Sequence, residues 1–90
     1  MIKFPFSRFE VCDRSMEPSF LSGNHVLTYN FSEIKPGSVI VFKYKNKYLI
    51  KRVKELKAGS IIAFSDNKKL ARSVYKINKS DLIGRVFLKY

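Results

Sequence analysis

Apolar residues recur along this chain in short runs that alternate with polar positions, which is the period of β-strands rather than of helices. Two β-branched and aromatic runs, 39–44 and 48–53, flank Lys45-Asn46-Lys47, and this pattern predicts a hairpin with its turn at Asn46. Further strands are expected at 25–29, 60–64 and 82–88, with residues 9–11 pairing at an edge.

The remaining pattern is that of loops. Residues 66–80 are polar and basic without a clear period, and we expect a loop there. No segment holds an apolar 3.6-residue period for three turns. The sequence therefore predicts an all-β, mainly antiparallel fold, a small coiled β-barrel-like single domain.

Length and composition limit the class of protein. Ninety residues support one domain, 1–90, and a hydrophobic content of 46% is too high for a disordered chain. The chain lacks an apolar run of about 18 residues, and the first ten residues interrupt their apolar positions with charge and proline. We therefore expect a soluble, cytoplasmic protein with neither membrane anchor nor signal peptide. A single Cys and a single His exclude an internal disulfide and argue against a metal site, and no cofactor is expected.

The formal net charge of +11 is unevenly spread. Residues 1–36 carry four bases and four acids, whereas residues 37–90 carry fourteen bases and three acids. Such an excess suggests an anionic partner, a nucleic acid or a membrane surface. In residues 42–48 lysines and aromatic residues interleave, as they do in nucleic-acid stacking platforms. The alternative is a hairpin whose outward lysines protect a sheet edge from aggregation, and we favour it.

One lysine falls on an apolar strand face. Alternation along 48–53 places Lys51 on the same face as Leu49 and Val53. A strand lysine of this kind can extend its ammonium to water at an edge. Alternatively it is desolvated, which lowers its pKa and lets the neutral amine act as a base. Periodicity alone leaves both interpretations open.

Ser15 lies in 12–18, a segment without a strand pattern. Taken alone it is a loop serine, because a serine hydroxyl is a weak nucleophile until a base takes its proton. His25, the usual type of base, is the only histidine and begins an expected strand, so a Ser-His-Asp triad is a minor alternative. Pairing Ser15 with Lys51 is the other way to build the same chemistry.

Several blocks of the chain share one order with a known group of enzymes. They are Val11-x-x-x-Ser15-Met16-x-Pro18, Gly23-Asn24-x-Val26, Pro36-Gly37-Ser38-Val39, Ile50-Lys51-Arg52-Val53, Ser65-Asp66-Asn67 and Ile83-Gly84-Arg85-Val86. This order resembles the Ser-Lys peptidases of the signal peptidase I and LexA-like superfamily, and the size resembles short soluble members such as nickel superoxide dismutase maturation proteases. The resemblance covers about residues 9–88 and implies the coiled β fold of that catalytic domain.

The resemblance also implies the chemistry. Ser15 would be the nucleophile and Lys51 the general base of a serine endopeptidase that cleaves a protein precursor after small residues. The substrate peptide would lie extended along a strand edge. Met16 would line the substrate groove or, equally, belong to the core.

Departures from the family pattern concern the residues around the serine. Asp13 replaces the usual glycine. In signal peptidases, the residues at this point help to form the oxyanion hole, partly through a side-chain hydroxyl two residues before the serine. Because a carboxylate cannot donate, we assign the oxyanion to the backbone N–H of Ser15. After Asn67 the usual pattern changes, and Ser73 is the candidate hydroxyl that orients the lysine.

Two alternatives stay open beside the peptidase hypothesis. One is a basic β-barrel module that binds nucleic acid, which leaves Ser15 and Lys51 unexplained and is not favoured. The other is an inactive, peptide-binding relative of the peptidase, supported by Asp13 and the altered segment after Asn67. The basic second part would also allow peripheral contact with anionic lipid head groups.

Overall fold

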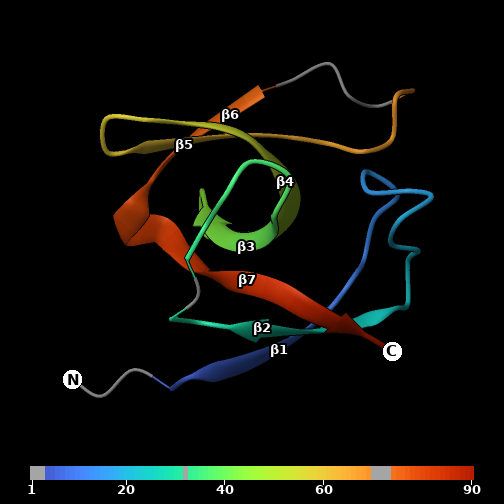
Figure 1. The fold of residues 1–90 in the computed structure, drawn as a ribbon. Helices are drawn as coiled ribbons and strands as arrows, with labels where there is room; N and C mark the ends of the chain where they lie inside the picture. Colours follow the sequence, from blue (N-terminus) through green and yellow to red (C-terminus); the bar gives the residue numbers. More distant parts are fainter. Residues whose placement is uncertain (1–3, 32, 70–73) are drawn as a thin grey trace.

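Seven strands form one antiparallel sheet in the computed structural model, which describes residues 4–31, 33–69 and 74–90 (Figure 1). The strands are β1 (Phe6–Glu10), β2 (His25–Tyr29), β3 (Val39–Tyr44), β4 (Lys47–Lys57), β5 (Ser60–Phe64), β6 (Val74–Asn78) and β7 (Leu82–Lys89). A short 3-10 helix, η1 (Lys79–Asp81), leads from β6 into β7. The order across the sheet is β1-β2-β7-β3-β4-β5-β6, so β1 and β6 are its edges. The predicted all-β, mainly antiparallel fold is confirmed.

The hairpin of β3 and β4 has a two-residue turn. Lys45 and Asn46 both have positive φ, 49° and 64°, which is the geometry of turns that match the right-handed twist of paired strands. Lys47 already pairs with Tyr44, so it belongs to β4 rather than to the turn. The predicted hairpin and the position of its turn at Asn46 are confirmed.

Two separate apolar clusters pack on the two faces of the coiled sheet. Along β3, Ile40 and Phe42 belong to one cluster, whereas their neighbour Val39 belongs to the other. Figure 1 shows how the sheet allows this, because β3 and β4 curl between the β5–β6 pair and the layer of β1, β2 and β7. The first cluster also contains Val53 of β4 and, from β5 and β6, Ile61, Ala63 and Ile77. Met16 and Phe20, from the segment between β1 and β2, complete the second with Val11 and Val26.

Most expected strands occur where the pattern placed them. β2 and β5 match the predicted ranges 25–29 and 60–64, and β7 extends one residue beyond 82–88. The edge strand begins earlier than expected, at Phe6, and Val11 lies outside it.

The expected loop at 66–80 is wrong in its second half, which contains β6. Only Ile77 of this strand is buried, so its sequence has little apolar period for a pattern analysis to detect. Pairing with β5, from Ser60 opposite Asn78 to Phe64 opposite Val74, holds the strand in place. Hydrogen bonds to a neighbouring strand therefore compensate for the weak local signal.

Gly84 marks a close approach between β7 and the residues that follow β2. A β-carbon on Gly84 would collide with the side-chain oxygen of Asn30 and the carbonyl oxygen of Tyr29. We expect Gly84→Ala to lower the free energy of unfolding by about 2 kcal/mol, because the backbone would have to move apart. Urea unfolding beside Ser80→Ala, an exposed control, measures the effect. An unchanged midpoint for Gly84→Ala would show that the strands separate without cost.

Candidate active site

The segment that carries Ser15 is held by backbone bonds and by buried apolar side chains. The N–H of Val11 donates to Asn24 and the N–H of Gly23 donates back to Val11, each within 2.8 Å, which closes the base of the loop. The N–H of Phe20 donates to Met16 at 2.9 Å. Since Val11, Met16 and Phe20 are all buried in the second apolar cluster, the loop is anchored on both sides of Ser15.

Lys51 lies in the middle of β4 with its side chain buried. It is 4% exposed and shares its strand face with Val53, which is 1% exposed. Its Nζ donates to Oγ of Ser15 at 2.7 Å, across 36 residues of sequence. The structure therefore brings together the two residues that the sequence singled out.

Burial lowers the pKa of the Lys51 ammonium, because the charged form loses its hydration. The carboxylate of Asp13 acts in the opposite direction and raises it. The Tyr75 ring, whose centroid lies 5.5 Å from Nζ, completes the surroundings of the amine. The net direction is downward, so a larger fraction of Lys51 is neutral at a given pH than of an exposed lysine.

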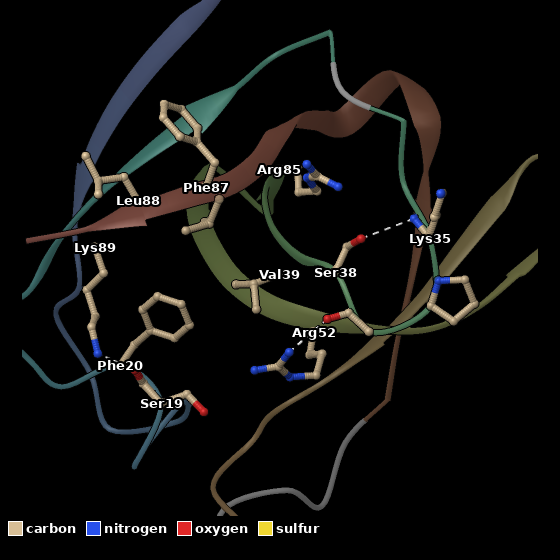
Figure 2. Close-up of a pocket in the computed structure, with 13 residues that line it drawn as sticks. Ser19, Phe20, Lys35, Ser38, Val39, Arg52, Arg85, Phe87, Leu88 and Lys89 are labelled. Carbon is tan, nitrogen blue, oxygen red and sulfur yellow. Dashed lines mark hydrogen bonds between the residues drawn. The ribbon is translucent and has the colours of Figure 1, made fainter.

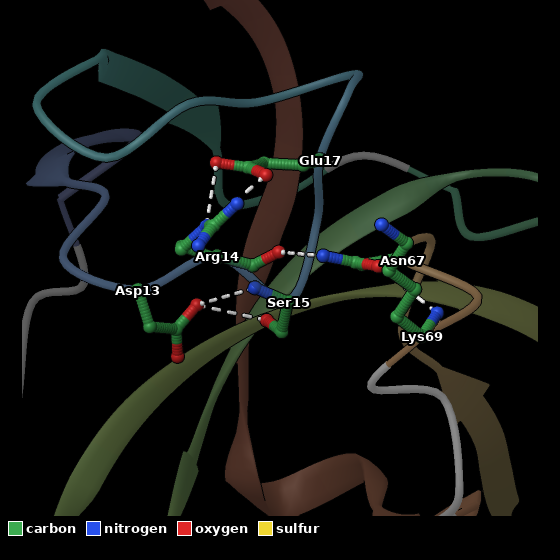
Figure 3. A network of polar contacts seen from close by, with 6 residues as sticks. All are labelled: Asp13, Arg14, Ser15, Glu17, Asn67 and Lys69. Carbon is green, nitrogen blue, oxygen red and sulfur yellow. Dashed lines mark hydrogen bonds and ion pairs between the residues drawn. The ribbon is translucent and has the colours of Figure 1, made fainter.

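Asp13 holds both polar groups of Ser15 that the proposed chemistry requires (Figure 3). Its Oδ1 accepts a hydrogen bond from the Ser15 hydroxyl at 2.9 Å and another from the Ser15 backbone N–H at 3.1 Å. The hydroxyl proton thus points to Asp13 rather than to Lys51. The N–H that sequence reasoning assigned to the oxyanion is also occupied in this conformation.

Asp66 and Asn67, which follow β5, hold the segment that carries Ser15 through hydrogen bonds. The N–H of Asn67 donates to the carbonyl of Ser15, and its side-chain amide donates to the carbonyl of Arg14, both at 2.8 Å. Asp66 receives two hydrogen bonds of 2.8 Å from Arg52. Although burial raises the pKa of Asp66, the bonds from Arg52 and Ser19 hold it below its usual range. The motif blocks around residues 15, 51 and 66 are therefore one connected structure.

A small cavity lies among the residues that directly precede Ser15 and Lys51 in the chain. It has a volume of about 110 Å³ and lies between the end of β1 with its following residues and the start of β4. Its lining is Phe9, Glu10, Val11, Cys12, Asp13, Val26, Val41, Tyr48, Leu49 and Ile50. An apolar cavity of about 150 Å³ holds a benzene ring, so this one suits a smaller side chain.

The other predicted site residues have different positions. Met16 is fully buried, which places it in the core rather than on the surface of a groove. Ser73 lies outside the described residues. The ring of His25 stacks on Tyr90 and lies 3.9 Å from the carboxylate of Glu10, away from the pair of Ser15 and Lys51.

Two further residues near the dyad, Tyr75 and Ser65, were not predicted from the sequence, and a third, Asp13, has a contact that was not predicted. Tyr75 lies on β6, where a loop was expected, because only one residue of that strand is buried and its local strand signal is weak. Ser65 was quoted only as part of a motif, yet the register Arg52–Phe64 brings it level with Lys51, and it is 6% exposed. Asp13 is a departure from the family pattern in the sequence, and the structure adds that its carboxylate accepts two hydrogen bonds from Ser15.

Metal ligation and membrane crossing find no support in the described part of the chain. Residues 4–31, 33–69 and 74–90 contain no group of three or more His, Cys, Asp or Glu residues that could hold a metal ion. Within the same residues no helix has the length and apolar character needed to cross a bilayer.

Comparison with known proteins gives one family. No curated protein matches the sequence significantly. The model of the Peptidase S24-like family matches residues 7–87, which is nearly the whole chain and includes Ser15, Lys51 and Asn67. This family lies within the LexA and signal peptidase I-like superfamily that the motif order resembles, and it supports a peptidase-type function in general. The chain belongs to the Peptidase S24-like family.

Proposed function

We propose that this chain is a serine endopeptidase in which Ser15 is the nucleophile and Lys51 the general base. The observation that carries the proposal is a buried lysine amine 2.7 Å from a serine hydroxyl. A structural lysine on an apolar face would be expected to extend its charge to water. Lys51 instead ends at a hydroxyl, in surroundings that lower its pKa, which is what a base for serine requires.

In the proposed reaction, Oγ of Ser15 attacks the scissile carbonyl carbon while neutral Lys51 takes the hydroxyl proton. The tetrahedral intermediate collapses as the C–N bond breaks, and Lys51 gives its proton to the leaving amine. A water molecule then attacks the acyl ester, losing a proton to Lys51, and Ser15 is released with its proton restored. The backbone N–H of Ser15 stabilises the oxyanion once it is freed from Asp13.

The small cavity beside the serine segment supports one substrate class. With a volume of about 110 Å³ bounded by β4 and the end of β1, it would accept a small side chain of an extended peptide. We therefore propose cleavage after small residues, in a protein precursor like those processed by the soluble maturation proteases that the sequence resembles.

A panel of labelled peptides tests this proposal. The peptides differ only in the residue before one bond, which is Ala, Ser, Val, Phe or Lys. The protein should cleave at that bond after Ala and Ser, and cleavage should disappear in Ser15→Ala prepared in parallel. Cleavage by both proteins at equal rates would reveal a contaminant, and no cleavage of any peptide between pH 6 and 10 would contradict the proposal.

Asp13 favours a second candidate, an inactive relative that binds peptides. Its carboxylate occupies the Ser15 N–H and draws the hydroxyl proton away from Lys51. Under the peptidase proposal this contact must break in every turnover, whereas under the second candidate it never does. Substitution of Asp13 therefore distinguishes an active peptidase from an inactive relative.

We expect Asp13→Ser to raise the cleavage rate about tenfold, because one competing hydrogen bond to the nucleophile is lost. Because Asp13 raises the pKa of Lys51, its removal lowers that pKa, and the limb on which the rate rises with pH should move to lower pH. The control is Glu33→Gln, an exposed acid in the segment before β3. If wild type and Asp13→Ser both fail to cleave the panel but bind the peptides, the inactive relative is the correct assignment.

The nucleic-acid alternative finds less support. Phe42, the first aromatic residue of the interleaved tract, is fully buried in the first apolar cluster. It therefore presents no ring face to a base, and only Tyr48 of this tract is a strongly exposed aromatic residue.

A further inference from the structure

A large cavity lies on the face of β4 opposite to Lys51 (Figure 2). Its volume is about 680 Å³, and it is a wide, open depression in the surface rather than an enclosed site. The walls come from β7, from the start of β3 with the preceding residues 35–38, and from the end of the serine loop. Arg52 reaches it because alternation along β4 turns this side chain away from the face of Lys51.

The lining of this cavity carries four cations and no acid: Lys35, Arg52, Arg85 and Lys89. Asp66, outside the lining, neutralises Arg52. Within the described part of the chain, the other three cations have no carboxylate partner. Lys89 donates to the carbonyl of Ser19 at 3.0 Å and lies over the ring of Phe20, 5.7 Å from its centroid, and Arg85 is half-buried in the sheet. A partly desolvated guanidinium without a counter-charge is costly, and an anionic ligand would supply one.

Apolar side chains separate the cations. Phe20, Val39 and Val86 form part of the wall, and Phe87 and Leu88 of β7, which are 49% and 46% exposed, lie at its rim. Figure 2 shows Lys89 beside Phe20 at one end and Lys35 beside Ser38 at the other, with Arg85 and Arg52 between. A ligand that pairs with the cations at both ends and also contacts the apolar wall needs negative charges at both of its ends and an apolar group between them.

We propose that this cavity is a docking site for an acidic segment of another protein that carries a large apolar side chain. The cations at both ends with apolar groups between them match an acidic peptide that carries one apolar side chain. The apolar walls suit a side chain better than a nucleic-acid backbone, whose binding depends mainly on phosphate contacts. Docking here leaves Ser15 and Lys51 free, so the site does not rest on the cleavage activity.

Fluorescence anisotropy with synthetic peptides tests the docking site, using the full chain with Ser15→Ala so that no peptide is cut. The probe is a labelled peptide with Asp and Glu on both sides of one Phe. One matched peptide replaces Phe with Ser, and another replaces every acid with Lys. We expect the probe to bind, the Ser peptide to bind more weakly, and the Lys peptide not to bind.

Charge substitutions then locate the binding. Lys35→Gln/Lys89→Gln should weaken binding of the probe about tenfold. Lys43→Gln/Lys54→Gln removes the same charge from exposed positions outside the cavity and should change it less than about twofold. Arg85→Gln, examined only if its unfolding curve matches the parent, should weaken it as well.

Three results would overturn the proposal. Equal losses in the two double variants would mean that net charge alone attracts the peptide. Binding of phosphatidylserine vesicles or a single-stranded oligonucleotide, but not of the probe, would assign the cavity to another partner. Absence of binding to all three probes would mean that the cavity is not a docking site.

Discussion

Replacement of Lys51 with methionine is expected to lower kcat/KM for peptide cleavage by about 10³-fold, because it removes the buried amine that takes the Ser15 proton in the proposed reaction and returns it to the leaving group. The fold should survive, since methionine matches the length of lysine and its neighbours on β4 are apolar. Lys54→Met is the matched control, an exposed lysine of the same strand, and it should retain wild-type activity.

The same substitution should raise stability. The pKa of Lys51 is lowered in the folded protein, whereas in the unfolded chain it is about 10.4. Between these values the unfolded state binds more protons, so the stability of the wild type rises with pH through this window and is lowest below it. Lys51→Met removes that penalty, and we expect it to increase the free energy of unfolding at pH 7 by about 1 kcal/mol.

Urea unfolding at pH 7 and pH 10 measures this effect. The gain from Lys51→Met should shrink at pH 10, because the wild-type lysine is then closer to neutral in both states. A variant that is less stable than the wild type at pH 7, yet cleaves peptides normally, would identify Lys51 as a structural cation.

Replacement of Ser15 with alanine is expected to reduce kcat by about 10⁴-fold, since the nucleophile itself is removed. Peptide affinity should stay within about twofold, because only one oxygen is lost and the cavity among residues 9–13 and 48–50 is unchanged. Ser60→Ala, at a half-buried serine of β5, is the control for removing a hydroxyl and should keep full activity.

Measurement of kcat by peptide cleavage and of Kd by anisotropy separates the two effects. A Ser15→Ala protein that loses peptide binding to the same extent as activity would indicate a folding defect. Retained cleavage would assign the reaction to another nucleophile.

The two-residue period of the sequence predicted most of the strands and one of the two residues of the candidate dyad, Lys51. Alternation along β4 was sufficient to mark Lys51, because a period of two assigns each residue to a face without tertiary knowledge. The hairpin at Asn46 was equally accessible, since the turn residues and flanking runs are local. Strand β6 could not be predicted in this way, because Ile77 is its only buried residue and its position depends on pairing with β5.

Several contacts around Ser15 and Lys51 could not be predicted from the sequence, because they depend on side-chain conformation and on packing between distant segments. Motif spacing suggested that Ser15 and Lys51 meet, but not that Asp13 would accept both hydrogen bonds of Ser15, which depends on a side-chain rotamer. Met16 had two equal interpretations, and only the packing of the second cluster places it in the core. The proximity of Tyr75 and Ser65 to Lys51 likewise follows from strand register rather than from any motif.

The central claim is that Lys51 activates Ser15 as a nucleophile, and trapping of the acyl-enzyme tests it most directly. A peptide ester with Ala at the acyl position is mixed with the protein, quenched in acid and examined by intact-mass and peptide-mapping mass spectrometry. We predict an added acyl mass that maps to Ser15, is absent from Ser15→Ala, and is strongly reduced in Lys51→Met. Hydrolysis of the ester by Ser15→Ala at the wild-type rate, or an acyl group mapped to another residue, would contradict the claim.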